Sequence, residues 1–120
     1  MNVRRDDKAL REVRSLCLAL PETSEVEAWG HPTFRAGKKM FAAFGGEGGD
    51  RTLGLKVGFE RQEELRKDAR FFPTPYAANQ GWVSLRIDNQ TDWDEVNGLV
   101  REAYRQVALK RMLKALDANA

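Results

Sequence analysis

The sequence has few of the residues from which metal centres, disulfides and membrane spans are built. Its 120 residues include one cysteine, Cys17, and one histidine, His31. A single cysteine excludes an internal disulfide and suits a reducing cytoplasm, and two such ligands are too few for a zinc site. No apolar run approaches the roughly 20 residues of a membrane-spanning helix, and no hydrophobic signal region follows the charged first residues. We therefore expect a soluble cytoplasmic protein with no membrane, metal or cofactor partner.

A complete catalytic set is also missing. His31 stands between a glycine and a proline, which is typical of a turn residue bonded to the backbone. Ser24 has no Gly-x-Ser-x-Gly elbow around it. The glycine-rich residues 45–49 precede a predicted strand, whereas a phosphate loop opens a helix, so they predict a hairpin tip. The sequence thus predicts no enzyme. An enzyme or small-molecule binder that uses His31 and the loop at residues 73–76 is the last-ranked hypothesis.

The composition is that of a globular chain with one core. It is 42% hydrophobic and 32% charged, with three tryptophans and six phenylalanines. This length predicts a single domain over residues 1–120, large enough to bury a core without covalent staples. Twenty basic and 18 acidic residues leave a net charge of +2. That balance permits an anionic partner without demanding one.

Amphipathic patterns predict a helix near each end of the chain. Residues 7–20 carry apolar side chains at three- and four-residue spacing, and a proline then ends the pattern. Residues 92–116 repeat this spacing and predict one rod of roughly 37 Å. Asp92 can cap the rod, with Glu95 as the reciprocal partner of a capping box. The remaining chain is then the sheet that these helices cover.

Short alternating runs, broken by glycine and proline, predict about five strands. The predicted strands are residues 25–29, 33–36, 39–44, 51–58 and 82–88. A charged helix is predicted at residues 59–69, and two prolines exclude regular structure from residues 71–76. The order α-β-β-β-β-α-β-α with short turns predicts a two-layer α+β domain, with an antiparallel sheet and both terminal helices on one face.

Basic and aromatic residues gather near the predicted turns and on the uncovered side of the sheet. Cations hold phosphates, and an indole ring can stack on a base. The candidate nucleic-acid-binding residues are Arg35, Lys38, Lys39, Arg51, Lys56, Trp82 and Arg86. The alternatives are a partly hydrated face, or a face covered by a second copy of the protein.

The order of these motifs resembles the MmcQ/YjbR family. The resemblance is carried by Leu18-Ala19-Leu20-Pro21-Glu22-Thr23, Trp29-Gly30-His31-Pro32-Thr33-Phe34-Arg35, Gly37-Lys38-Lys39-Met40-Phe41-Ala42, Leu55-Lys56-Val57, the proline-rich loop to Tyr76, Gly81-Trp82-Val83-Ser84-Leu85, and Ala103-Tyr104. It implies a secretion-chaperone-like or frataxin-like antiparallel sheet with flanking helices. It also implies DNA binding through two hairpin wings, which here would be residues 37–39 and 45–49.

Two functions follow as expectations. The first is a non-catalytic DNA-binding protein, in which the six candidate cations contact phosphate and Trp82 stacks or wedges. The second is a protein-interaction or homodimerisation module without a nucleic-acid function.

Overall fold

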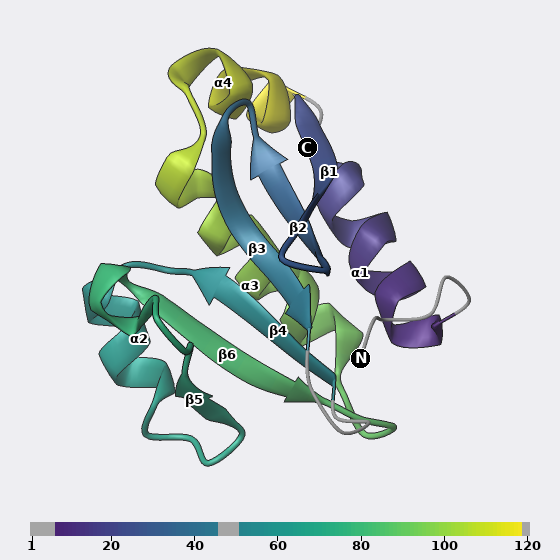
Figure 1. Cartoon of the computed structure of the whole chain (residues 1–120). Helices are drawn as coiled ribbons and strands as arrows, with labels where there is room; N and C mark the ends of the chain where they lie inside the picture. Colours follow the sequence, from purple (N-terminus) through teal and green to yellow (C-terminus); the bar gives the residue numbers. More distant parts are fainter. Residues whose placement is uncertain (1–6, 46–50, 119–120) are drawn as a thin grey trace.

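The computed structural model describes residues 7–45 and 51–118. The elements in chain order are α1 (Lys8–Leu18), β1 (Thr23–Ala28), β2 (His31–Ala36), β3 (Lys39–Gly45), β4 (Arg51–Lys56), α2 (Phe59–Leu65), β5 (Phe71–Pro73), the 3-10 helix η1 (Ala78–Gln80), β6 (Trp82–Ile87), α3 (Trp93–Val107) and α4 (Lys110–Ala118). This order confirms the predicted α+β class (Figure 1). None of these helices has the length and apolar character that a membrane crossing requires.

Six strands form one antiparallel sheet in the order β1-β2-β3-β4-β6-β5. Residues alternate between its two faces, except at a bulge in β3, where Phe41 is an extra residue between the pairs Phe34–Ala42 and Arg35–Met40. We call the side of Leu53 and Leu55 the helix face, and the side of Thr52, Gly54 and Lys56 the outer face. In Figure 1, α3 passes behind β3 and β4, so the reader looks onto the outer face.

The helix face carries the hydrophobic core. The apolar stripes of α1 and α3 close over it, as predicted, with Leu10, Val13, Cys17, Val96, Val100 and Tyr104 all buried. The rings of Phe41 and Tyr104 meet edge to face at a centroid distance of 5.7 Å. The Tyr104 hydroxyl donates to the Pro21 carbonyl oxygen at 2.8 Å, which satisfies the one polar atom of the ring. Burial raises the pKa of the Cys17 thiol to about 12, and the nearby Glu25 carboxylate adds to this rise.

The predicted single rod at residues 92–116 is wrong, because Ala108 is extended (ψ 144°) and separates α3 from α4. After Val107, the next positions on the same stripe hold Lys110, Arg111 and Lys114. The apolar residues of α4 are displaced by one position, so an unbroken helix would bury cations. The extended Ala108 changes the helical phase of α4 relative to α3, so that Met112 and Leu116 are buried.

The sequence predicts no regular structure at residues 71–76. This prediction is wrong for residues 71–73, which form strand β5 and pair with β6. Phe71 lies opposite Leu85 and is buried on the helix face. Pro73 ends the strand. Proline is compatible with this position because β5 is an edge strand that leaves one side unpaired.

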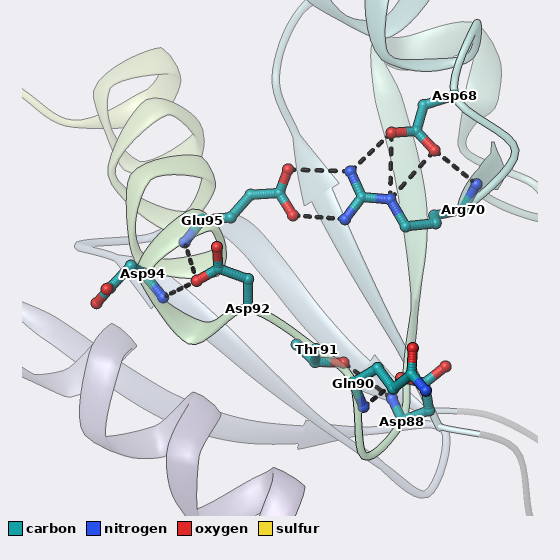
Figure 2. Close-up of polar contacts among 8 residues, drawn as sticks. All are labelled: Asp68, Arg70, Asp88, Gln90, Thr91, Asp92, Asp94 and Glu95. Carbon is teal, nitrogen blue, oxygen red and sulfur yellow. Dashed lines mark hydrogen bonds and ion pairs between the residues drawn. The ribbon is translucent and has the colours of Figure 1, made fainter.

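An arginine ties the β5 edge to α3 (Figure 2). The Arg70 guanidinium donates to both Glu95 carboxylate oxygens, at 2.7 and 3.0 Å, and to both oxygens of Asp68. These hydrogen bonds lower the pKa of Asp68 to about 2. Asp92 caps α3 as predicted, accepting from the N–H groups of Asp94 and Glu95. The Glu95 carboxylate, however, faces Arg70 and does not complete a capping box.

Candidate nucleic-acid interface

Strand register determines which side chains share the outer face. The pairs Val26–Thr33, Thr33–Ala43, Ala43–Gly54, Gly54–Ser84 and Ser84–Phe72 run across all six strands. This central row consists mostly of small residues. On one side of it the outer face carries His31, Thr52 and Arg86. On the other side it carries Arg35, Met40, Lys56 and Trp82.

Three of the predicted cations lie on the outer face. Arg35 is half-buried on β2, Lys56 is half-buried at the end of β4, and Arg86 is exposed on β6. The Arg86 guanidinium lies over the Phe72 ring, 4.6 Å from its centroid, which fixes the cation on this face. Arg35 and Lys56 lie on the same side of the central row, because each comes two residues after the row residue of its strand, Thr33 or Gly54, and β2 and β4 both pair antiparallel with β3.

The other two lysines lie at the β2–β3 turn. Lys38 is exposed within the turn, and Lys39 is exposed at the start of β3. Lys39 pairs with Ala36, a residue of the core, so the register assigns it to the helix face. Lys38 therefore lies at the tip of this hairpin, where the register assigns it to neither face, whereas Lys39 belongs to the helix face. Of the second predicted wing, residues 45–49, all but Gly45 lie outside the described residues.

The placement of Arg51 on the outer face is wrong. Arg51 pairs with Ile87 and has the same strand parity as Leu53, so it belongs to the helix face. There its guanidinium forms an ion pair with Asp7, the N-cap residue of α1. Burial opposes ionisation of Asp7, but the hydrogen bonds from Arg51 and from the Leu10 N–H outweigh it and lower the pKa of Asp7. Arg51 thus anchors the start of α1.

Trp82 lies on the predicted face of the sheet, but it is not exposed as predicted. It pairs with Lys56 on the outer face, yet only 7% of it is accessible. Helix α2 and η1 pack against β6 here, and the Gln62 side-chain amide donates to the carbonyl oxygens of Ala78 and Trp82, at 2.6 and 2.7 Å. A base cannot stack on an indole that is already covered.

The outer face differs from the rest of the surface in its charge pairing. The outward-facing strand residues in the described part of the chain include no carboxylate. The eight ion pairs found there use the arginines Arg14, Arg51, Arg61, Arg70, Arg105 and Arg111. Arg35, Lys38, Lys56 and Arg86 are in none of them. Their charges are therefore available to an anionic partner.

Two buried polar atoms on the outer face have no hydrogen-bond partner within residues 7–45 and 51–118. They are His31 Nδ1 and Arg35 Nε. His31 is the first residue of β2, and its ring lies so close to Gly45 that an added Cβ would be 3.2 Å from Nδ1. The interpretation of His31 as a backbone-bonded turn residue is therefore wrong.

A groove lies between α2 and α3. Phe59, Arg61, Glu64, Glu102 and Arg105 are among its lining residues. Arg61 donates to Glu102 at 2.9 Å, and Arg105 pairs with Asp117 at 2.7 Å. Its cations are already paired, so it is a weaker anion site than the outer face. Within the described ranges, no cluster of three histidine, cysteine or acidic side chains could hold a metal ion.

A family model described as YjbR matches residues 18–106. The chain belongs to the YjbR family. The matched range begins at the last residue of α1, spans the whole sheet and ends one residue before the end of α3, so the YjbR part of the chain contains the complete outer face.

Solved structures share this YjbR architecture. The crystal structure of Deinococcus radiodurans protein DR2400, which has the family-model domain DUF419, is similar with a TM-score of 0.74 and 26% identity. That match covers 90% of this chain and 87% of the other. A Pseudomonas syringae protein of 16% identity has the same fold, with a TM-score of 0.65 over 83% of this chain and 97% of the other. No curated protein sequence matches the chain significantly.

Two exposed aromatics of the YjbR region were not among the predicted binding residues. Trp29 is 90% exposed in the β1–β2 turn, and Tyr76 is fully exposed in the loop after β5. Both have a left-handed backbone, with φ values of 52° and 64°. That conformation is uncommon for aromatic residues. For Trp29 the sequence signal was Gly30, because two-residue hairpin turns favour glycine at the second central position.

Proposed function

We propose that the outer face of the sheet binds DNA through its phosphate backbone, without catalysis, and that the protein acts in the cytoplasm. The observation that carries the proposal is the absence of carboxylates among the outward-facing strand residues that the structure describes, combined with the unpaired charges of Arg35, Lys56 and Arg86. Unpaired cations release the counterions of the phosphates when they bind, whereas paired arginines must first lose a carboxylate.

The predicted interface is revised accordingly. Arg35, Lys38, Lys56 and Arg86 contact phosphate, with Lys39 at the border. Arg51 and Trp82 have structural roles and are not part of it. Four or five phosphate contacts on a chain of net charge +2 imply weak binding with little sequence preference.

The test is a fluorescence-anisotropy titration of labelled duplex DNA at 50 and 150 mM salt. The variant Arg35→Ala/Lys56→Ala/Arg86→Ala should bind much more weakly, and its salt slope should fall by roughly 0.9 for each phosphate contact removed. The control variant Arg101→Ala/Lys110→Ala/Lys114→Ala removes the same charge from exposed positions on α3 and α4. Equal losses in both variants would contradict a defined interface, and so would the absence of binding at tens of micromolar protein.

A protein-interaction role is the second candidate, because Val26 of the edge strand β1 is 37% exposed and Trp29 of the same hairpin is exposed as well. Self-pairing of β1 around Val26 would, however, place Glu25 opposite Glu27 of the other copy, and like charges directly opposite are destabilising. A different protein is therefore a better partner than a second copy. Light scattering that gives a monomer mass at all concentrations removes the dimer version.

A further inference from the structure

Trp29 occupies a turn position that disfavours it. The β1–β2 hairpin closes between Ala28 and His31 with Trp29 and Gly30 at its two central positions, both with positive φ (52° and 78°). Such two-residue turns favour Asn-Gly, because a side chain with a Cβ crowds the backbone in the left-handed region. Trp29 gains no compensating burial, since 90% of it is exposed.

Tyr76 repeats this combination elsewhere in the chain. The Ala77 N–H donates to the Thr74 carbonyl oxygen at 3.2 Å, which closes a turn with Pro75 and Tyr76 at its centre. Tyr76 has a φ of 64° at the second central position, where glycine or asparagine is usual. Its side chain is fully exposed.

Nothing in the described protein stabilises either ring, so the fold does not account for them. An aromatic residue held on a disfavoured backbone without packing contacts is a local conflict of the kind that marks functional sites. A structural reading would predict burial, as for Trp82, or an ordinary backbone, as for the exposed helical Phe59.

Both turns adjoin the outer face. Trp29 directly follows Ala28 and precedes His31 by two residues, and His31 belongs to the outer face. The Thr74 hydroxyl lies 2.8 Å from the Ser84 hydroxyl, and a Cβ on Gly54 would be 3.6 Å from the Thr74 methyl carbon. The turn with Tyr76 therefore starts on the outer face. The strands β2 and β6 are three spacings apart, roughly 14 Å, and the row between them is mostly small residues.

We propose that Trp29 and Tyr76 are stacking platforms for the bases of single-stranded nucleic acid, whose phosphates lie along the outer-face cations. The proposal rests on the proposed function. Bases in a duplex are already stacked on one another, so two separate exposed rings add affinity only for an unpaired strand. Base–aromatic stacking tolerates any sequence, because every base has a π face. DNA and RNA share this chemistry.

The test compares three labelled 15-mers by anisotropy: oligo-dT, an abasic strand with the same phosphates, and a dT·dA duplex. The wild-type protein should bind oligo-dT more tightly than the abasic strand. Trp29→Ala and Tyr76→Ala should each weaken oligo-dT binding about 5- to 150-fold, in line with the loss of one stacked base, and leave abasic and duplex binding unchanged. Trp29→Phe and Tyr76→Phe should retain most of the affinity. Oligo-U in a parallel titration distinguishes RNA from DNA as the preferred strand.

Phe59→Ala is the matched control, because Phe59 is 62% exposed but lies on α2 with a helical backbone. Binding of oligo-dT should also quench the emission of Trp29, and this quenching should vanish in Trp29→Phe although Trp82 and Trp93 remain.

Unchanged oligo-dT affinity in both alanine variants would overturn the stacking proposal and leave the proposed function standing if the outer-face charge variant loses binding. Equal losses on oligo-dT and abasic strands would overturn it as well. If the protein self-associates and Trp29→Ala abolishes this, Trp29 is a protein contact and its role in stacking is overturned. Failure of the wild-type protein to bind any of the strands would instead refute the proposed function itself.

Discussion

The two faces of the sheet use the same kinds of residues in opposite ways. On the helix face, aromatic rings are buried, as Phe41 is against Tyr104, and the arginine of the face, Arg51, is neutralised by a carboxylate. On and beside the outer face, Trp29 and Tyr76 are exposed, and Arg35 has no carboxylate partner in the described ranges. Apart from Trp82, which is buried on the outer face, the same residue types thus stabilise the fold on one side and are available for binding on the other.

This contrast arises from strand alternation together with what covers each face. A cation at an odd-numbered position of β4 meets the N-terminus of α1, whereas one at an even-numbered position meets solvent. Stability and binding should therefore be separable by mutation, because few side chains contribute to both.

The largest effect is expected from a core truncation. Phe41→Ala removes a fully buried ring beneath Tyr104 and should destabilise the protein by about 3–5 kcal/mol. Lys56→Ala on the outer face should change stability by less than about 0.5 kcal/mol. Urea denaturation measures both. Similar losses from the two variants would show that the outer face is also structural.

The next effect concerns the cap that joins α1 to β4. Asp7→Ala removes the hydrogen bond to the Leu10 N–H and the partner of Arg51, and should cost about 1–2 kcal/mol at pH 7. Because the folded-state pKa of Asp7 lies below its ordinary value of 3.8, this contribution is complete above pH 4 and disappears as the pH falls through the lowered pKa.

Urea denaturation of the wild type and Asp7→Ala at pH 7 and at about pH 2 measures this. The difference between their free energies of unfolding should be smaller in acid. Asp117→Ala, which removes an exposed partner of Arg105, is the control and should have a smaller effect. A gap between wild type and Asp7→Ala that stays constant with pH would contradict the assigned ion pair.

A smaller effect, of the opposite sign, is expected in the β1–β2 turn. Trp29→Asn replaces an exposed ring at φ 52° with a residue that tolerates the left-handed region. It should stabilise the protein by roughly 1 kcal/mol while reducing binding to single strands. Thermal unfolding gives the first quantity. A lower melting temperature would mean that the Trp29 ring packs against the protein in solution.

The smallest effect is expected at the clamp formed by Arg70, Asp68 and Glu95. Arg70→Ala should lower the melting temperature slightly at pH 7, because these side chains are largely solvated. The pKa of Asp68 is lowered to about 2, so its contribution is present above its ordinary pKa and is lost as the pH falls to about 2. The melting temperatures of the variant and the wild type should then be equal. Arg66→Ala, at an exposed neighbouring position, is the control.

Much of the fold could be predicted from the periodicity of the sequence. All five predicted strands and the first two helices are confirmed, with end positions that differ by a few residues. The break at Ala108 was missed because a stripe of mixed apolar residues conceals a one-residue change of phase. Strand β5 was missed because three residues are too few to show alternation.

The candidate site was less predictable because it depends on what covers each side chain. Arg51 shares its parity with Leu53, so its position could have been deduced from alternation alone. The burial of Trp82 could not, since Gln62 and η1 reach it only after α2 folds beside β6. The left-handed backbone of Tyr76 could not be predicted either, because no glycine stands next to it in the sequence.

The buried Cys17 offers a practical opportunity. With a pKa of about 12 and no exposed surface, this thiol is almost entirely protonated and shielded from reagents at neutral pH. Any cysteine introduced on the surface, for example at Lys38, would therefore be the one reactive position of the native molecule. A spin label or fluorophore could be attached there without first removing the natural residue.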